Sequence, residues 1–117
     1  MSSEIARALD AVAGARDNIA LIREWAGALD LDALRADRKS RYAIERAFMA
    51  LDAAVRDVPA ELLGAHGIPA NLIAGFRNVL AHTYDDILDD RVILTIREDL
   101  PALDRALSSM QAALRAV

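Results

Sequence analysis

Side chains capable of acid-base chemistry gather in one short stretch of the sequence, Phe76 to Asp86 (FRNVLAHTYDD). His82 can donate or accept a proton near neutral pH, and Arg77 can hold an anion through two parallel hydrogen bonds. Asn78 adds an amide and Tyr84 a phenolic hydroxyl. Most of the remaining sequence is alanine-rich and helical in pattern, so this stretch is the first candidate for a functional site.

Helical geometry divides these side chains between two stripes. Arg77 and Tyr84 lie seven positions apart and share one stripe, whereas Asn78, His82 and Asp85 lie on the next stripe, about 100° around the helix. Asn78 can hydrogen-bond the His82 ring one turn later and fix its tautomer. Arg77 and His82 therefore meet at one ligand only if the arginine reaches around, the helix distorts, or a second protomer contributes.

The same stretch also has structural interpretations. Arg77 and Asn78 can simply solvate a helix face, and His82 and Tyr84 can be packing residues with local hydrogen bonds. A spacing of four residues from His82 to Asp86 and Asp90 would suit a metal ion if the helix continued. An acidic run is more typical of a solvated helix end, so we expect no metal and no cofactor.

Composition narrows the class of protein. A chain of 117 residues is long enough for one core, so we expect a single domain spanning 1–117. It contains no cysteine, and its first ten residues carry Glu4, Arg7 and Asp10 instead of an apolar leader. No uncharged apolar run approaches the roughly 18–20 residues that span a bilayer. We therefore expect a soluble cytoplasmic protein with no membrane partner.

The charge balance bears on nucleic-acid binding. A net charge of −4 and a pI near 5.0 argue against a broad basic surface, and we expect no DNA binding. The one basic cluster consists of Arg35, Arg38, Lys39 and Arg41. It is either a solvated helix face, balanced by nearby aspartates, or a contact for the RNA backbone.

Two other residues could take part in binding. Trp25, near a helix end, is expected in the core or an interface and not as a stacking platform for bases. His66, between two glycines, is expected to be an ordinary loop residue.

Apolar residues recur at helical spacing in four long segments. The expected helices run from Ile5 to Leu29, from Asp37 to Val58, from Pro69 through Leu80, and from Asp99 to Val117. The apolar stripe of the second is Ile44, Phe48, Leu51, Val55 and Val58, and that of the last is Leu103, Leu107, Met110, Leu114 and Val117.

The intervening segments are short. We expect a break at 29–34, a helical turn and loop at 60–68, and a short helix at 85–99, where the β-branched run VILTI has no partner strand. The predicted fold is an all-α, up-and-down bundle of four main helices plus one or two short helices.

The string RNVLAHTY, Arg77 to Tyr84, matches the R-x4-H-x-Y signature of the HEPN superfamily, and the chain resembles HepT-type toxins. The resemblance extends to DRKSRYAIERAF at Asp37–Phe48 and DLPALDRAL at Asp99–Leu107. Two departures stand out. Asp52-Ala53-Ala54 replaces a frequent Gly-Glu-Ala, and Ala70 replaces a frequent tryptophan.

The resemblance implies a metal-independent endoribonuclease. Arg77, Asn78 and His82 would be catalytic, and Arg38, Lys39 and Arg41 would contact RNA. HEPN proteins build their site at a homodimer interface, which would supply a second histidine. HepT-type toxins are also paired with a minimal nucleotidyltransferase antitoxin, which here would transfer AMP to Tyr84.

Two further hypotheses remain open. Related all-α proteins bind substrate for a separate minimal nucleotidyltransferase without cleaving RNA, and a purely structural adaptor would give the motif no role. A neighbouring nucleotidyltransferase gene would support either paired function, and toxicity on expression alone would then select the ribonuclease.

Overall fold

The computed structural model describes residues 2–28, 31–68 and 93–117. Its helices are α1 (Ser3–Ala28), α2 (Leu31–Ala36), α3 (Arg38–Arg56), α4 (Ala60–Ala65), the π-helical turn η1 (Thr95–Asp99) and α7 (Leu100–Arg115). The described residues contain no strand, and the predicted all-α fold is confirmed. The helix expected from Pro69 lies outside the described residues.

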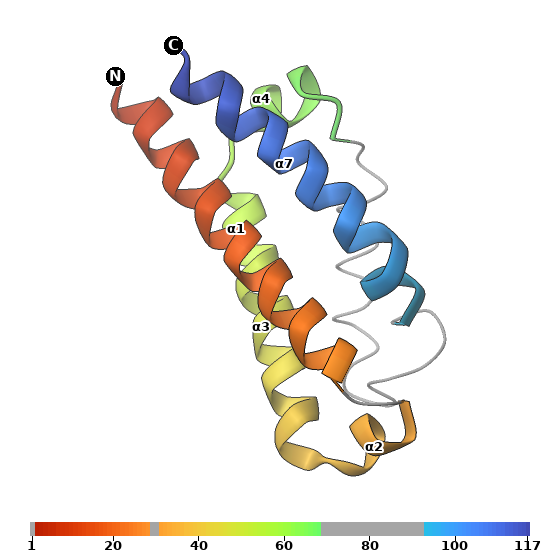
Figure 1. The fold of residues 1–117 in the computed structure, drawn as a ribbon. Helices are drawn as coiled ribbons and strands as arrows, with labels where there is room; N and C mark the ends of the chain where they lie inside the picture. The colour runs from red at the N-terminus through yellow and green to blue at the C-terminus, as the bar shows by residue number, and fades with distance from the viewer. Residues whose placement is uncertain (1, 29–30, 69–92) are drawn as a thin grey trace.

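Three long helices lie side by side in the arrangement of Figure 1. α1 packs against both α3 and α7 and runs antiparallel to each of them. The two ends of the chain consequently lie at the same end of the bundle. This is the up-and-down connectivity that short loops favour.

The buried stripe of α1 alternates small and branched side chains. Its fully buried positions are spaced by four and three residues: Ala8, Val12, Ala15, Ile19 and Ile22. The spacing keeps them on one face. Ile5 and Leu9 pack at the edge of the same core. Small alanines leave room for side chains of the facing helices, and Phe48 and Leu107 are among the fully buried large ones.

The predicted inner stripe of α3 is confirmed, since all five of its apolar residues are buried: Ile44, Phe48, Leu51, Val55 and Val58. The helix itself ends at Arg56, two residues before the predicted end at Val58. Pro59 excludes helical geometry from the residue before it, and the turn 57–58 forms there instead.

The connection after α3 follows the prediction of a short helix and a loop. α4 occupies Ala60–Ala65, and His66 forms its C-terminal cap, donating its backbone N–H to the carbonyls of Leu62 and Gly64. Gly67 then takes a φ of +70°, which a residue with a Cβ adopts only with strain. Ile68 returns to the core and is buried.

The approach to the last helix is helical, as predicted for VILTI, but its form is unexpected. Ile93 and Leu94 are α-helical, Thr95–Asp99 is a π-helical turn, and α7 follows without interruption. Pro101 lies in the first turn of α7 and has no N–H to donate. The Leu100 N–H bonds to Thr95 O, five residues back, which is the wider π pattern.

Two local predictions need correction. The expected break at 29–34 is partly helical. Its last four residues begin α2, a short helix that runs from Leu31 to Ala36. The inner stripe of the last helix stops at Leu114. α7 ends at Arg115, and Val117 is 81% exposed, so it is a terminal residue and not a core residue.

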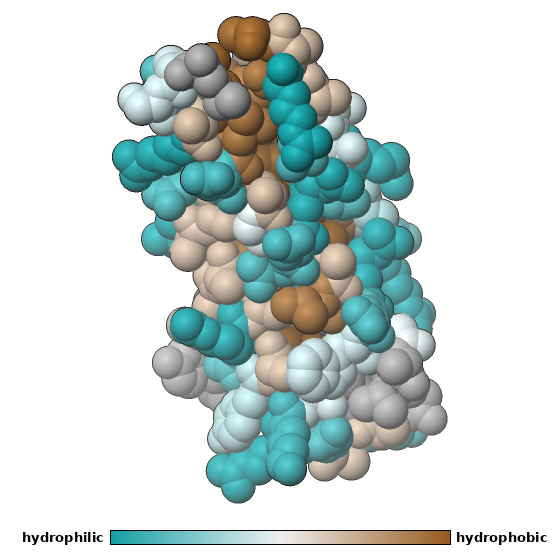
Figure 2. All heavy atoms as spheres, turned by 60° about the vertical axis from the view of Figure 1, so that its left-hand side comes forward, coloured by the Kyte–Doolittle hydropathy of each residue, from teal (hydrophilic) through white to brown (hydrophobic). Residues whose placement is uncertain are grey.

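The surface seen in Figure 2 is mainly hydrophilic, with hydrophobic side chains reaching it in patches. Among the described residues, the exposed large apolar side chains include Leu21, Trp25, Tyr42, Met49 and Leu94. No helix in the described part of the chain is long and apolar enough to cross a bilayer.

Candidate functional site

The predicted site falls into two parts. Arg77, Asn78, His82 and Tyr84 lie within 69–92, outside the described residues, so their arrangement remains a prediction. The predicted RNA contacts Arg38, Lys39 and Arg41 lie together in the first turn of α3. These three residues, with Tyr42 one turn after Arg38, are called the α3 basic cluster below.

Asp37 fixes the start of the helix that carries the α3 basic cluster. Its Oδ1 accepts a hydrogen bond from the Lys39 backbone N–H at 3.2 Å, and its Oδ2 accepts one from Ser40 Oγ at 2.6 Å. The hydrogen bond from Ser40, aided by that from Lys39, lowers the pKa of the Asp37 carboxyl. An aspartate in this position satisfies a backbone donor that the helix leaves free, so Asp37 holds the first turn.

Ser40 ties this cap to α1. Its hydroxyl also accepts a hydrogen bond from Trp25 Nε1 at 2.9 Å, and Ser40 is buried. Trp25 is 40% exposed and lies between the two helices with its N–H paired. It thus joins α1 to α3, but it is not buried in the core, which was one of the two positions expected for it.

Arg38 and Tyr42 form a pair on the α3 surface. The guanidinium carbon of Arg38 lies 5.4 Å from the centre of the Tyr42 ring, and Nη2 donates to the Tyr42 hydroxyl at 3.3 Å. This hydrogen bond raises the pKa of Arg38. Tyr42 is nevertheless 55% exposed. Sequence reasoning missed it, although the i, i+4 spacing of an arginine and a tyrosine could have indicated the pair.

Within residues 2–28, 31–68 and 93–117, the cations of the α3 basic cluster have no carboxylate partner at salt-bridge distance. Some described arginines elsewhere do: Arg7 pairs with Asp57, and Arg56 with Asp52. Arg38 and Lys39 are exposed, while Arg41 is half-buried and its enclosed Nε has no hydrogen-bond partner. Unpaired guanidinium groups in one helical turn are suited to bidentate contacts with phosphate oxygens.

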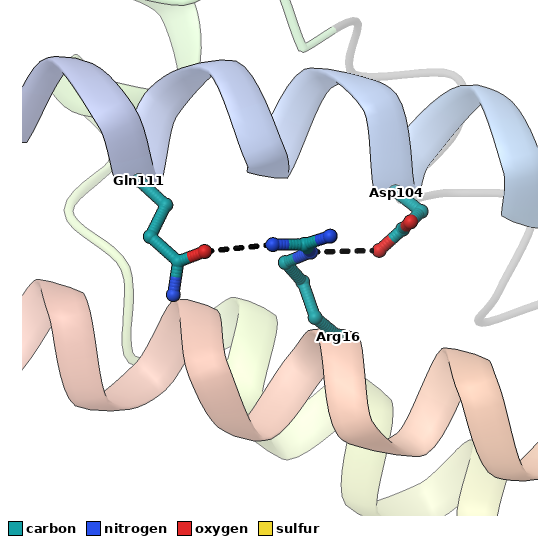
Figure 3. Close-up of polar contacts among 3 residues, drawn as sticks. All are labelled: Arg16, Asp104 and Gln111. Atoms are coloured by element: carbon teal, nitrogen blue, oxygen red, sulfur yellow. Dashed lines mark hydrogen bonds and ion pairs between the residues drawn. The ribbon is translucent and has the colours of Figure 1, made fainter.

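A different polar cluster joins α1 to α7 (Figure 3). Arg16 Nε donates to Asp104 Oδ1 at 3.0 Å, and Arg16 Nη1 donates to Gln111 Oε1 at 2.7 Å. An open hollow of about 350 Å³ adjoins these side chains and is also lined by Asp17 and Arg23. Because the partners lie 88 and 95 residues away along the chain, no local sequence pattern indicated this cluster.

The first departure from the usual pattern puts a carboxylate inside the fold. Asp52 is 8% exposed, and its Oδ2 accepts from Arg56 Nε at 3.0 Å. Its Oδ1 is buried without a hydrogen-bond partner. The frequent glycine at this position would place no charge there. The second departure, Ala70, lies outside the described residues.

In the described part of the chain, no group of three histidine, cysteine, aspartate or glutamate residues is arranged to hold a metal ion. The set His82, Asp86 and Asp90 lies outside it. His66 is partly buried at the end of α4, the position of a loop residue, as predicted.

An antiparallel helical bundle, with no strand among the described residues, defines an all-α protein. The comparison with known families is more specific. Residues 15–110 match the family model described as ribonuclease HepT-like. This range covers most of the chain and includes both Arg38–Tyr42 and Arg77–Tyr84, so the chain belongs to the ribonuclease HepT-like family. No curated protein and no solved structure gives a significant match.

Proposed function

We propose that this protein is a metal-independent endoribonuclease toxin that cleaves RNA through the ribose 2′-hydroxyl. The observation that carries the proposal is the family match over residues 15–110, together with the R-x4-H-x-Y string inside it. RNA contains its own nucleophile. The protein then has to remove the 2′ proton, protonate the departing 5′ oxygen and stabilise charge on the phosphate.

The residues of the motif match these tasks. His82 transfers a proton near neutral pH, Asn78 orients its ring, and Arg77 binds the phosphate through two hydrogen bonds. As the 2′ oxygen bonds to phosphorus and the bond to the 5′ oxygen breaks, one fragment ends in a 2′,3′-cyclic phosphate and the other in a 5′-hydroxyl. No water or metal-bound hydroxide enters this step.

A homodimer would complete the site. One chain offers a single histidine in the motif, whereas the reaction needs both a base and an acid. Arg77 and His82 also lie on different stripes of an ideal helix. A two-fold axis next to this helix would place two copies of each residue across one cleft.

The ends of the products and the effect of Arg77→Ala test the chemistry. In excess chelator, the wild type should still cut RNA and leave cyclic phosphates, and should sediment as a dimer at micromolar concentration. Arg77→Ala should slow cleavage by roughly 10²–10³-fold, the usual effect of losing one donor that stabilises transition-state charge. The matched control is Arg105→Ala, on the exposed face of α7. Loss of wild-type cleavage in chelator with recovery in magnesium, or products ending in 5′-phosphate, would contradict the mechanism.

We further propose that a minimal nucleotidyltransferase partner controls the toxin by AMPylating Tyr84. The phenolate would attack the α-phosphorus of ATP, with pyrophosphate leaving. Tyr84 shares the helical stripe of Arg77, so the added phosphate would occupy the guanidinium and repel the RNA backbone.

Intact mass measures this modification. Incubation with the partner, ATP and magnesium should add whole AMP units, and Tyr84→Phe should prevent the gain while leaving the protein toxic. Tyr42→Phe is the control. It removes the other tyrosine of the chain and should gain AMP like the wild type. Continued modification and neutralisation of Tyr84→Phe would place the acceptor elsewhere.

A further inference from the structure

The outer face of α3 carries an exposed stripe of cationic and apolar side chains. Arg38, Tyr42, Arg46 and Met49 recur at spacings of four, four and three residues, so they lie along one side of the helix. All four are exposed. The opposite side of α3 is the buried inner stripe. Packing of the bundle core therefore does not explain why these four residue types occur here.

Tyr42 has the properties of a prepared stacking surface. More than half of its surface is open, and Arg38 holds the ring through a hydrogen bond to the hydroxyl and a cation–π contact. The ring keeps its position because two contacts from the preceding turn restrain it. An aromatic side chain restrained in this way loses little conformational freedom when a second flat group stacks on it.

Positive charge surrounds this ring. Lys39, Arg41 and Arg46 lie within about one turn of Tyr42, and none is within salt-bridge distance of a carboxylate in the part of the chain that the structure describes. The nearest acids along the helix are Glu45, which is half-buried, and Asp37, which caps the helix next to Arg38 and whose charge interacts with that of Lys39. Unpaired donors around an exposed ring suit a ligand that alternates flat groups with anionic groups.

We propose that Tyr42, restrained by Arg38, is a stacking platform for an unpaired RNA base and that the neighbouring cations hold the flanking phosphates. The proposal deepens the proposed function by assigning single-stranded RNA as the form that binds. Single strands present bases that can stack on aromatic rings between backbone contacts. In a duplex the bases are already stacked, so only the phosphates would reach the cluster.

Binding to an uncleavable RNA tests the platform independently of catalysis. The probe is a fluorescent single-stranded 2′-O-methyl oligonucleotide, whose blocked 2′ oxygen cannot attack, compared with its duplex by anisotropy. Tyr42→Ala should weaken single-strand binding by about 5- to 100-fold, the effect of losing one stacked base. Tyr42→Phe should retain most of the affinity. Leu21→Ala, at an exposed apolar residue of α1, is the matched control and should bind like the wild type.

Salt dependence separates stacking from charge. Lys39→Ala should reduce the slope of log affinity against log salt, because it removes a phosphate contact without touching the Arg38–Tyr42 pair. Tyr42→Ala should leave that slope unchanged and should remove the preference for single strand over duplex.

Three results would overturn the platform. Tyr42→Ala could bind the single strand with wild-type affinity, or it could lose affinity equally for single strand and duplex. Tyr42→Ala could also change the oligomeric state of the protein, which would mark the stripe as a protein interface. Failure of the proposed function looks different, since the wild type would then bind the uncleavable probe but not cut ordinary RNA.

Discussion

Arg16 and Arg38 show two different uses of the same side chain. Arg16 lies between α1 and α7, where Asp104 and Gln111 accept hydrogen bonds from two of its nitrogens. Arg38 lies at the start of α3, where the partner that it has among the described residues is the neutral Tyr42 hydroxyl. One arginine is used to join two helices, and the other leaves most of its donors open.

The difference separates structural charge from charge available to a ligand. The side chains of Arg16 and Asp104 are 34% and 26% exposed, so water replaces their contacts only in part when one partner is removed. The cations of the α3 basic cluster mostly reach solvent, and among the described residues no carboxylate forms a salt bridge with them, although Asp37 lies nearby at the cap. A polyanion can bind them without first breaking an ion pair, which is why the cluster is the better candidate for RNA contact.

The largest effect on folding should come from Arg16→Ala. We expect it to lower the free energy of unfolding by about 1–2 kcal/mol, because Asp104 and Gln111 lose a charged donor in a partly exposed setting. Urea denaturation measures this change. Arg23→Ala, two turns further along α1 and exposed, should change stability by less than about 0.5 kcal/mol. If Arg16→Ala kept full stability but weakened RNA binding, the two arginines would have been assigned to the wrong roles.

A smaller effect is expected from Asp37→Ala, which removes the cap beneath the α3 basic cluster. The folded pKa of Asp37 lies below its ordinary value of 3.8, because Ser40 and the Lys39 backbone bond to the carboxylate. The stabilisation is therefore present when the pH lies well above the ordinary value of 3.8, and it is lost as the pH falls through the lower, folded pKa. The wild type should unfold at higher urea than Asp37→Ala at pH 7, with the gap narrowing in acid. Asp10→Ala is the exposed control; a gap that widened in acid would contradict the sign.

Much of the fold could be predicted because amphipathic spacing is local. The inner stripe of α3 and the stripe from Leu103 to Leu114 follow from positions three and four residues apart. The prediction that Val117 is buried was wrong, since α7 stops at Arg115 and apolar spacing alone does not locate a helix end. The π-helical turn at 95–99 depends on which carbonyl accepts the Leu100 N–H, and composition does not reveal that choice.

The candidate site likewise has features that the sequence could predict and features that it could not. Position in sequence was enough to find the α3 basic cluster, because its members lie within one turn. Sequence could not distinguish a paired from an unpaired arginine. Arg16 finds Gln111 at a distance of 95 residues along the chain, and only the packing of α1 on α7 brings them together.

The most direct test of the proposed ribonuclease compares the two histidines of the chain. His82→Ala should lower the rate of RNA cleavage by roughly 10²–10⁴-fold, because the reaction loses a positioned group for proton transfer. His66→Ala, at the C-terminal cap of α4, should cleave like the wild type. Single-turnover rates with one labelled RNA measure both variants under identical conditions. Cleavage by His82→Ala at the wild-type rate would contradict the assignment of the site.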